Sequence, residues 1–227
     1  MTEPTVTRPR RAGAADRRRE REAQIIAATR ELFDARGVRD AQIEDVARAV
    51  GINRAIIYRH FTGKEELFAL TEAEYLKALD ARLRKVDDPS ASPEQRLSRI
   101  TEEFVDFALT YPAFIDCAVT ILRVGPALLD EVSASALFRL GRGMTACLRH
   151  VVDVLEAGRD AGVFEVQDAD VVANLMYAQA LGGLQVARLG VMVRETIPGT
   201  PEVASLDPTE VKRQLVAASL ALARHSE

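Results

Sequence analysis

Several chemically versatile residue types are scarce in this 227-residue sequence. It has no tryptophan, two cysteines and three histidines, and aromatic residues make up 5% of the chain. Cys117 and Cys147 lack CxxC spacing and have apolar neighbours, so we expect reduced, buried thiols, with a disulfide or redox switch as the alternative. The start of the sequence has no apolar signal core, which favours a cytoplasmic protein.

Signatures of enzymes and membrane proteins are also missing. There is no GxSxG, Walker A or dinucleotide-binding motif, and His60, His150 and His225 are too far apart in sequence to indicate a metal site. The nearest approach to a membrane span, residues 171–193, is interrupted by polar residues such as Arg188. We therefore predict neither an enzyme nor a membrane protein, and no catalytic residue, metal or cofactor.

The net charge of −4 conceals two regions of opposite sign. Residues 1–64 contain 14 Lys and Arg against 9 Asp and Glu, a net charge of +5. Residues 65–227 contain 16 against 25, a net charge of −9. This asymmetry predicts that only the N-terminal part of the chain meets a polyanion.

Helical periodicity and capping residues predict about nine helices and essentially no sheet. Residues 1–16 have no apolar period and should form a flexible, arginine-containing arm. The expected helices span 17–36, 40–50, 53–60, 65–84, 92–110, 112–124, 127–158 and 168–188, with a last one beginning at 207. The expected N-caps are Asp40, Asn53, Thr62, Ser92, Asp168 or Asp170, and Asp207. Residues 194–206 are predicted to form a loop, and a few residues around 163–166 are the one candidate strand.

The first three helices, within residues 17–64, have the lengths and the glycine corner of a helix-turn-helix unit, with the motif itself at 42–61. In such units the second helix of the motif lies in the major groove of DNA. Ile57 and Phe61 should seat this helix on its neighbours. Arg54, Ala55 and Arg59 should then face outward, together with His60.

The expected contacts with DNA follow from position on this helix. Arg54, near its start, is the first candidate for bidentate pairing with guanine, and Ala55 or Ile56 for contact with a thymine methyl group. Glu44 is either a cytosine contact or an idle exposed charge. Gln42, Tyr58 and Lys64 suit phosphates, which position a protein without specifying sequence. The full candidate set is Gln42, Ile43, Glu44, Asn53, Arg54, Ala55, Ile56, Tyr58, Arg59, His60 and Lys64.

Three basic features of the sequence each allow a functional and a structural interpretation. Arg59 is a base or phosphate contact, or a solvated helix charge. His60 is more often structural than discriminating. The arginines at 8, 10, 11 and 17–21 are a solvated tail and helix start, or an arm for the minor groove.

The segment "AQIEDVARAVGINRAIIYRHFTGKEELF" resembles the DNA-binding domain of the TetR family of transcriptional regulators. The positions that agree with the family pattern are Ile43, Val46, Ala47, Gly51, Ile52, Ile57, Tyr58, His60, Phe61, Lys64, Glu65 and Leu67. Departures are Gln42 in place of Thr or Ser, Val50 in place of Ala, Asn53 in place of Ser and Ala55 in place of Gly. The motif positions that carry the resemblance lie within about residues 17–70.

The resemblance implies an all-α homodimer: an N-terminal three-helix DNA-binding domain followed by a C-terminal helical bundle, residues 65–227, that dimerises and binds an effector. It implies a ligand-responsive regulator, usually a repressor, that leaves a palindromic double-stranded DNA operator when a small molecule binds.

Sequence patterns in the last two expected helices favour dimerisation over packing within one chain. Small or polar residues recur at four-residue spacing in one helix, and an apolar stripe marks the other. The expected interface residues are Asn174, Ala178, Gly182, Val211, Leu215, Ala218 and Leu222.

An effector cavity should be mainly aliphatic, because aromatic residues are few, and a lipophilic ligand is therefore preferred. Each candidate lining residue is also compatible with ordinary core packing. The candidates are Phe104, Phe107, Phe114, Ile121, Met144, Tyr177 and Leu181, with Arg123, Gln179 or Gln185 as polar anchors.

Two rival classes remain at this level. An enzyme is disfavoured by the missing motifs. A sequence-indifferent DNA-compacting protein is suggested by the arginine-rich arm, and it would bind random DNA as tightly as its own upstream region at matched salt.

Overall fold

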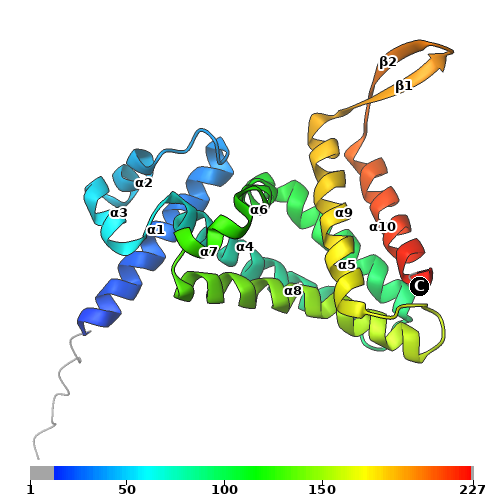
Figure 1. Cartoon of the computed structure of the whole chain (residues 1–227), viewed down its shortest axis with the longest axis horizontal. Coiled ribbons are helices and arrows are strands. Elements are labelled where there is room, and N and C mark those ends of the chain that lie inside the picture. Colours follow the sequence, from blue (N-terminus) through cyan, green and yellow to red (C-terminus); the bar gives the residue numbers. More distant parts are fainter. Residues whose placement is uncertain (1–12, 226–227) are drawn as a thin grey trace, which may run out of the picture.

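The computed structural model describes residues 13–225, and these residues form ten α-helices, one 3₁₀ helix and one β-hairpin (Figure 1). The predicted all-α class is confirmed. The α-helices are α1 (Ala14–Arg36), α2 (Ile43–Val50), α3 (Arg54–His60), α4 (Lys64–Val86), α5 (Pro93–Thr110), α6 (Pro112–Val124), α7 (Leu128–Glu131), α8 (Ala134–Asp160), α9 (Ala169–Leu189) and α10 (Pro208–Arg224). Residues 1–12 of the expected arm lie outside the described residues, and 14–16 belong to α1.

Helices α1, α2 and α3 pack around a shared apolar centre. Its most buried members are Ile25, Ile26, Phe33, Val46, Ala47, Ile57 and Phe61. Gly51 ends α2 in the left-handed conformation, with φ 70°, which side chains other than glycine rarely adopt. Asn53 begins α3, and its side-chain oxygen accepts a hydrogen bond from the Ala55 N–H at 2.9 Å. This cap was predicted, as were those at Ser92, Asp168 and Asp207.

Two predicted caps are wrong, because tertiary contacts and neighbouring residues take over their role. The N-cap of α2 is Gln42, not Asp40, and the Gln42 N–H donates to Asp45 at 3.3 Å. At the start of α4 the Thr62 hydroxyl donates instead to the carbonyl oxygen of Glu131, 2.8 Å away. The N-cap of α4 is Gly63, which has no capping side chain, and the Glu66 carboxylate accepts from the Thr62 N–H.

The α4 helix joins the first three helices to the rest of the chain (Figure 1). Near its start, Phe68 meets the ring of Phe33 from α1 edge to face, with centroids 5.2 Å apart. Two turns later the Tyr75 hydroxyl donates to Asp34 of α1 at 2.6 Å. The second half of α4 then packs along α8, so one continuous helix belongs to both parts of the molecule.

The remaining helices form the C-terminal bundle, in which α9 and α10 stand next to each other (Figure 1). The single helix predicted over 127–158 is instead divided into a 3₁₀ turn (Gly125–Ala127), α7 and α8. The division occurs because Val132 turns into the core and Ser133 caps α8 by accepting from the Ala136 N–H. One apolar stretch, Pro112–Glu131, is long enough to cross a membrane by composition, but it includes this break and α6 contributes to the core.

A β-hairpin replaces the loop predicted at 194–206. Strands β1 (Val191–Ile197) and β2 (Thr200–Ser205) pair antiparallel and project beyond α9 and α10 (Figure 1). Val191, Val193 and Ile197 lie on the same side of an extended chain, which is a strand pattern. The pattern is short, and the nearby glycine and prolines favour a loop. No strand forms at 163–166 in the described part of the chain.

Near the end of α8, the backbone of Gly158 lies very close to the ring of Phe164. A Cβ atom added to Gly158 would lie 2.0 Å from the ring of Phe164, which is buried. A Cβ on Gly141, in the same helix, would meet no atom within 4 Å.

We expect Gly158→Ala to lower the free energy of unfolding by about 1–3 kcal/mol through overpacking. Gly141→Ala should raise it by up to about 1 kcal/mol, because alanine favours a helix. Denaturant unfolding of the two variants and the parent protein measures both effects. Equal changes at the two glycines would contradict the close approach.

Candidate nucleic-acid interface and internal cavity

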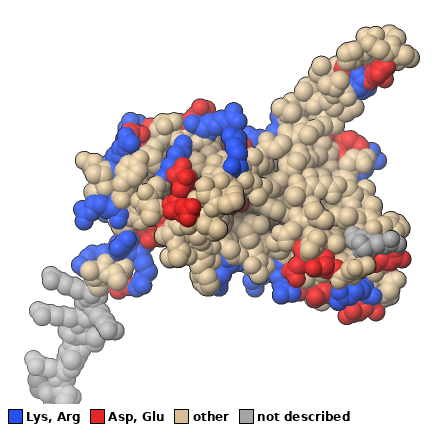
Figure 2. Space-filling view, in the orientation of Figure 1, with Lys and Arg blue, Asp and Glu red and all other residues tan. Residues whose placement is uncertain are grey.

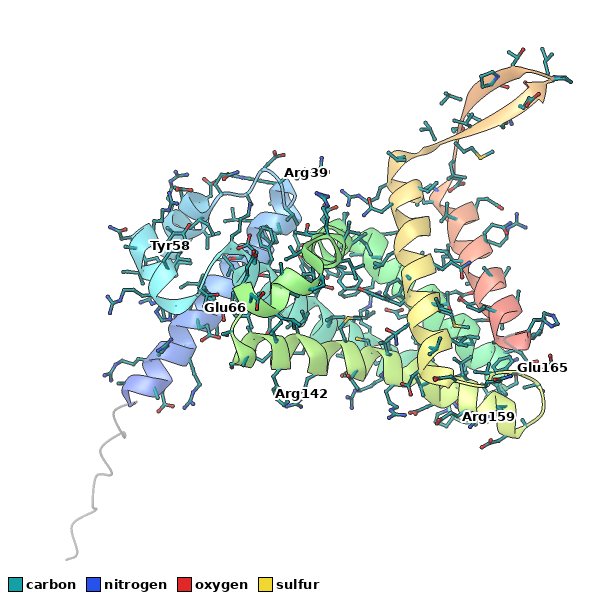
Figure 3. The ribbon with its side chains drawn as sticks, viewed as in Figure 1. Arg39, Tyr58, Glu66, Arg142, Arg159 and Glu165 are labelled. Atoms are coloured by element: carbon teal, nitrogen blue, oxygen red, sulfur yellow. The ribbon has the colours of Figure 1, made fainter. Side chains whose placement is uncertain are left out.

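The outer face of α3 is open to solvent. Ile57 is buried against the other two helices, whereas Arg54, Ala55, Tyr58 and Arg59 are exposed, Tyr58 at 44%. Tyr58 points away from the molecule (Figure 3). A short helix seated by one apolar side chain and carrying cations on its other face has the geometry of a recognition helix.

Arg54 is held by its neighbours on this face. Its guanidinium forms an ion pair with Glu44 of α2 and donates to the Tyr58 hydroxyl at 3.2 Å. Both carboxylate and guanidinium are half exposed, so solvent weakens the pair. Glu44 is therefore not an idle charge, and its contact with a cytosine stays a prediction. Guanine pairing would require Arg54 to leave Glu44.

His60 is not on the outer face, contrary to the sequence-based expectation. Its side chain is half buried, and the Nδ1 atom is buried without a hydrogen-bond partner. Burial, and secondly the positive charge of Arg18 from α1, lower the pKa of His60 below 6.5. The ring is therefore neutral at pH 7 and adds no cation to the surface.

The other candidates surround α3. Gln42 is exposed, Ile43 packs half buried against the core, and Lys64 lies over the Phe68 ring at 4.9 Å. Lys and Arg side chains spread over this end of the molecule (Figure 2). Arg39 and Arg48 are exposed there as well, and sequence reasoning did not include them.

Contacts between distant segments tie this region to the bundle. Glu66 of α4, only 5% exposed, accepts hydrogen bonds from the Ser133 hydroxyl at the start of α8 and from the Thr62 N–H. Arg139 of α8 reaches Glu22 of α1 at 2.6 Å. These contacts connect α8 with both α4 and α1.

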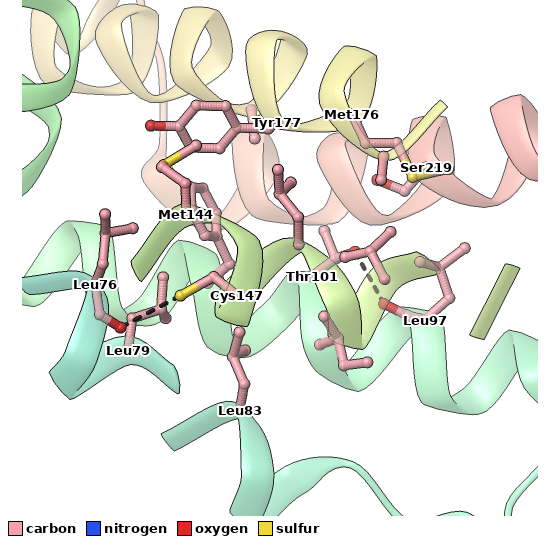
Figure 4. A pocket seen from close by; sticks show the side chains of 16 residues that line it. Leu76, Leu79, Leu83, Leu97, Thr101, Met144, Cys147, Met176, Tyr177 and Ser219 are labelled. Carbon is pink, nitrogen blue, oxygen red and sulfur yellow. Dashed lines mark hydrogen bonds between the residues drawn. The ribbon is translucent and has the colours of Figure 1, made fainter. Parts of the chain in front are cut away.

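A cavity of about 60 Å³ lies inside the bundle, walled by α4, α5, α8, α9 and α10 (Figure 4). Its wall is aliphatic except for a few residues, including Phe104, Cys147 and Tyr177. The Cys147 thiol already donates to the Leu76 carbonyl oxygen at 3.3 Å, and burial raises its pKa to about 12. No lysine, arginine or histidine lines this cavity.

Three of the predicted pocket residues, Phe104, Met144 and Tyr177, line the cavity. The other predicted residues do not line this cavity, and their part in binding an effector stays a prediction. Phe107 and Phe114 form a buried aromatic pair with centroids 5.3 Å apart, and Leu181 is buried elsewhere in the core. Ile121 lines a separate groove beside Lys64; Arg123 and Gln179 are exposed, and Gln185 is half buried outside the lining. Sequence periodicity identifies which face of each helix is buried, but it does not tell which helices pack against that face.

The predicted interface residues separate into two groups. Asn174, Ala178 and Gly182 of α9 are exposed in the single chain. Val211 and Leu215 of α10 are buried in the chain's own core, and their place in an interface stays a prediction. Ala218 and Leu222 are half buried. Both cysteines are free and buried.

Sequence reasoning missed Glu72 of α4. Its side chain is 1% exposed, and neither carboxylate oxygen has a hydrogen-bond partner. Burial raises its pKa well above the ordinary value of 4.5. A signal was present: Glu72, Leu76, Leu79 and Leu83 recur at helical spacing, so the acid stands on an apolar stripe.

Replacing Asn53 tests how α3 is fixed. Asn53→Ala should lower the free energy of unfolding by about 1 kcal/mol, because it removes the acceptor for the Ala55 N–H. Asn53→Ser should keep most of the stability, since serine also caps helices. Thermal or denaturant unfolding provides the measurement, and equal losses in both variants would exclude capping as the cause.

Comparisons with known proteins agree with this geometry. The family model "Bacterial regulatory proteins, tetR family" matches residues 25–71. The chain is 30% identical over 90 residues to the transcriptional activator FasR of Mycolicibacterium smegmatis, covering 40% of this chain and 41% of FasR. It is 35% identical over 86 residues to the transcriptional repressor KstR2 of Mycobacterium tuberculosis, covering 38% of this chain and 42% of KstR2. The chain thus matches about two fifths of the length of each relative.

Beyond the N-terminal domain, the chain can be compared with solved structures by its fold. The crystal structure of RolR in complex with resorcinol superposes with a TM-score of 0.64 at 16% identity, covering 92% of this chain and 90% of RolR. At that identity the likeness concerns the fold alone. Residues 25–71 thus match the N-terminal domain of the tetR family of bacterial regulatory proteins, and the fold agrees with that of RolR along nearly the whole chain.

Proposed function

We propose that this protein is a dimeric, ligand-responsive transcriptional repressor that binds a palindromic DNA operator in the cytoplasm and leaves it when a small lipophilic effector enters the bundle. The observation that carries the proposal is the seating of α3: Ile57 is buried while Arg54, Tyr58 and Arg59 remain exposed. The DNA-binding domain would comprise residues 17–64, and residues 65–227 would bind the effector and dimerise.

The roles on DNA follow from the exposed positions. Arg54 near the start of α3 would leave Glu44 and pair with guanine, and Ala55 or Ile56 would contact a thymine methyl group. Gln42, Tyr58, Arg59 and Lys64 would contact phosphates. Asn53 and His60 would act structurally, the first as a cap and the second against α1.

Support for a dimer comes from an apolar stripe on the outside of α9. Its exposed members recur at helical spacing: Val171, Leu175, Ala178, Gly182, Val186 and Leu189. Leu175 is 53% exposed and Leu189 is 70% exposed. A contiguous apolar surface of this kind marks an interface in soluble proteins, and two copies related by twofold symmetry would cover it.

The proposed response is mechanical. Two recognition helices of a dimer must lie about 34–36 Å apart, or at a multiple set by the operator, to enter successive major grooves. The cavity is walled partly by α4, which also carries the contacts to α1 through Tyr75 and Phe68. A ligand that enlarges the cavity would tilt α4 and change the separation. Such a ligand must prefer the released state by several kcal/mol to empty the operator.

The direction of regulation rests on the usual mode of the family. Among the matched relatives, KstR2 is named a repressor and FasR an activator. Selecting bound fragments from the source genome and placing one upstream of a reporter gene decides between the two. Repression predicts less transcription in the presence of the protein.

Arg54→Ala tests the recognition helix. On a selected operator fragment it should weaken binding roughly five- to 150-fold through loss of the guanine contact. Arg142→Ala is the matched control, because Arg142 is exposed on α8 in the bundle (Figure 3). Electrophoretic mobility or fluorescence anisotropy titrations at fixed salt measure both.

Two results would count against the proposal. Equal affinity of the Arg54→Ala and Arg142→Ala variants for the fragment would remove Arg54 from base recognition. If the parent protein bound random DNA as tightly as the fragment, binding by charge alone would replace sequence recognition.

Gly182→Arg tests the dimer. A charged side chain in the centre of the α9 stripe should shift the protein to monomers, because Gly182 has open space around it in the single chain and only the partner would be displaced. Gly141→Arg, at an equally open helical glycine on α8, should leave the dimer intact. Sedimentation or light scattering at matched concentration gives the mass. A Gly182→Arg dimer as tight as the parent would place the interface elsewhere.

A further inference from the structure

Glu72 is buried on α4, one helical turn before the first α4 residue that lines the internal cavity, Leu76. Glu72, Leu76, Leu79 and Leu83 follow one another on the same face of α4, and the three leucines line the cavity. Glu72 therefore continues the lining stripe by one turn, about 6 Å along the helix axis, toward the first three helices.

Three residues facing α4 feel the Glu72 charge. A negative charge on Glu72 raises the pKa values of Cys147 of α8 and Tyr177 of α9, in each case behind a larger effect of burial. Cys147 and Tyr177 line the cavity. Cys117 of α6 responds in the same way. These effects agree with the helical spacing that places Glu72 on the same face of α4 as the lining residues Leu76, Leu79 and Leu83.

No group within the described part of the chain compensates Glu72. Its two oxygen atoms have no hydrogen-bond partner, and burial is the one cause of its raised pKa, with no contribution from a cation. The neighbouring Cys117, Cys147 and Tyr177 are themselves weak acids. A buried polar group without a partner costs free energy, so its presence in an otherwise well-packed core requires an explanation.

Glu66, six residues earlier on the same helix, shows what a structural carboxylate looks like here. It accepts hydrogen bonds from Ser133 and Thr62, and it links two elements of the fold. Glu72 links nothing in the chain. Its side chain is instead placed beside a cavity whose lining has neither a cation for an acidic ligand nor another ionisable group of normal pKa.

We propose that the cavity binds an apolar ligand carrying one amine, whose ammonium group pairs with the Glu72 carboxylate while its hydrocarbon part occupies the aliphatic walls. This inference rests on the proposed function, because it names the chemical class of the effector. Fatty acids and other anionic ligands are disfavoured, since their carboxylate would meet Glu72 without a compensating cation.

The proposal predicts that ligand binding releases protons, which can be measured. The amine arrives as an ammonium ion, and burial raises the pKa of Glu72, which favours the protonated carboxyl group. Pairing requires the carboxyl group to lose its proton to solvent, so each ligand bound releases about one proton. A neutral ligand of the same size releases none.

Three probes of equal length separate the head groups: n-hexylamine, 1-hexanol and hexanoate. Calorimetric titration of the full-length protein should show hexylamine binding at least about ten-fold more tightly than hexanol, with hexanoate weakest. Titrations in two buffers of different ionisation enthalpy should show the released proton for hexylamine alone. Equal affinity for hexanol and hexylamine, or no proton release, overturns the proposal, and this readout needs no variant.

Two substitutions locate the effect. Glu72→Gln keeps the shape of the side chain and should bring the affinity ratio of hexylamine to hexanol close to one. Glu102→Gln, at an exposed position of α5 next to the lining residue Thr101, should keep the parent's ratio. Retention of the amine preference in Glu72→Gln would assign it to another group and refute the proposal.

The stability of the variant follows from the same carboxyl group. The pKa of Glu72 is higher in the folded protein than in the unfolded chain, so above pH 4.5 only the unfolded chain releases the proton. The parent protein should therefore lose stability relative to Glu72→Gln as the pH rises above that value. A variant less stable than the parent at pH 7 would show that the carboxylate is paired in the folded state, contrary to the proposal.

Measurements of operator binding distinguish a failure of this inference from a failure of the proposed function. If hexylamine binds through Glu72 but leaves the affinity for a selected operator fragment unchanged, the ligand class stands and release by the effector fails. If the protein binds the fragment specifically but shows no preference for the amine, the DNA-binding function stands and the role of Glu72 fails.

Discussion

Burial of α4 is the constraint on which the two halves of the molecule depend. From Glu66 to Ala73 every residue of this helix is buried, so two full turns are enclosed on all sides. The helix begins against α1 and continues as a wall of the internal cavity. Because protein interiors are packed as densely as organic crystals, a change of volume at the cavity cannot be absorbed locally. The helix α4 that lines the cavity is also in contact with α1 of the recognition unit.

The two buried glutamates of α4 illustrate how the same residue type serves opposite purposes. Glu66 has partners on both of its oxygens and fixes the junction between α4 and α8, which makes it a structural group. Glu72 has none among the described residues, and burial raises its pKa because it disfavours the charged form. Folding tolerates such a group where surrounding apolar packing supplies the stability, and binding sites are where such unsatisfied groups are found.

The outer surface of the bundle is as informative as its interior. The exposed apolar stripe on α9 continues toward the β-hairpin, where Val193 is 72% exposed and Val203 is 69% exposed. Within α10, by contrast, the apolar residues Val211 and Leu215 already pack inside the chain, and the Gly183 position of α9 lets Leu215 approach closely. The two helices therefore differ in role: α10 completes the core, whereas α9 presents apolar surface on its other side.

Local sequence determined the helices, most of their caps and the recognition unit, because those depend on residues three or four positions apart. The spacing of Ile57 and Arg54 already separated the seated side of α3 from its outer side. Pairings between distant segments followed only from the tertiary structure: Arg54 with Glu44, His60 against α1, and the residues that enclose the cavity. Periodicity tells which face of a helix is apolar, but the face it meets depends on packing among helices far apart in the chain. Helical spacing already placed Glu72 on an apolar stripe, but its lack of a hydrogen-bond partner, like the packing of Val211 in the core, followed only from the tertiary structure.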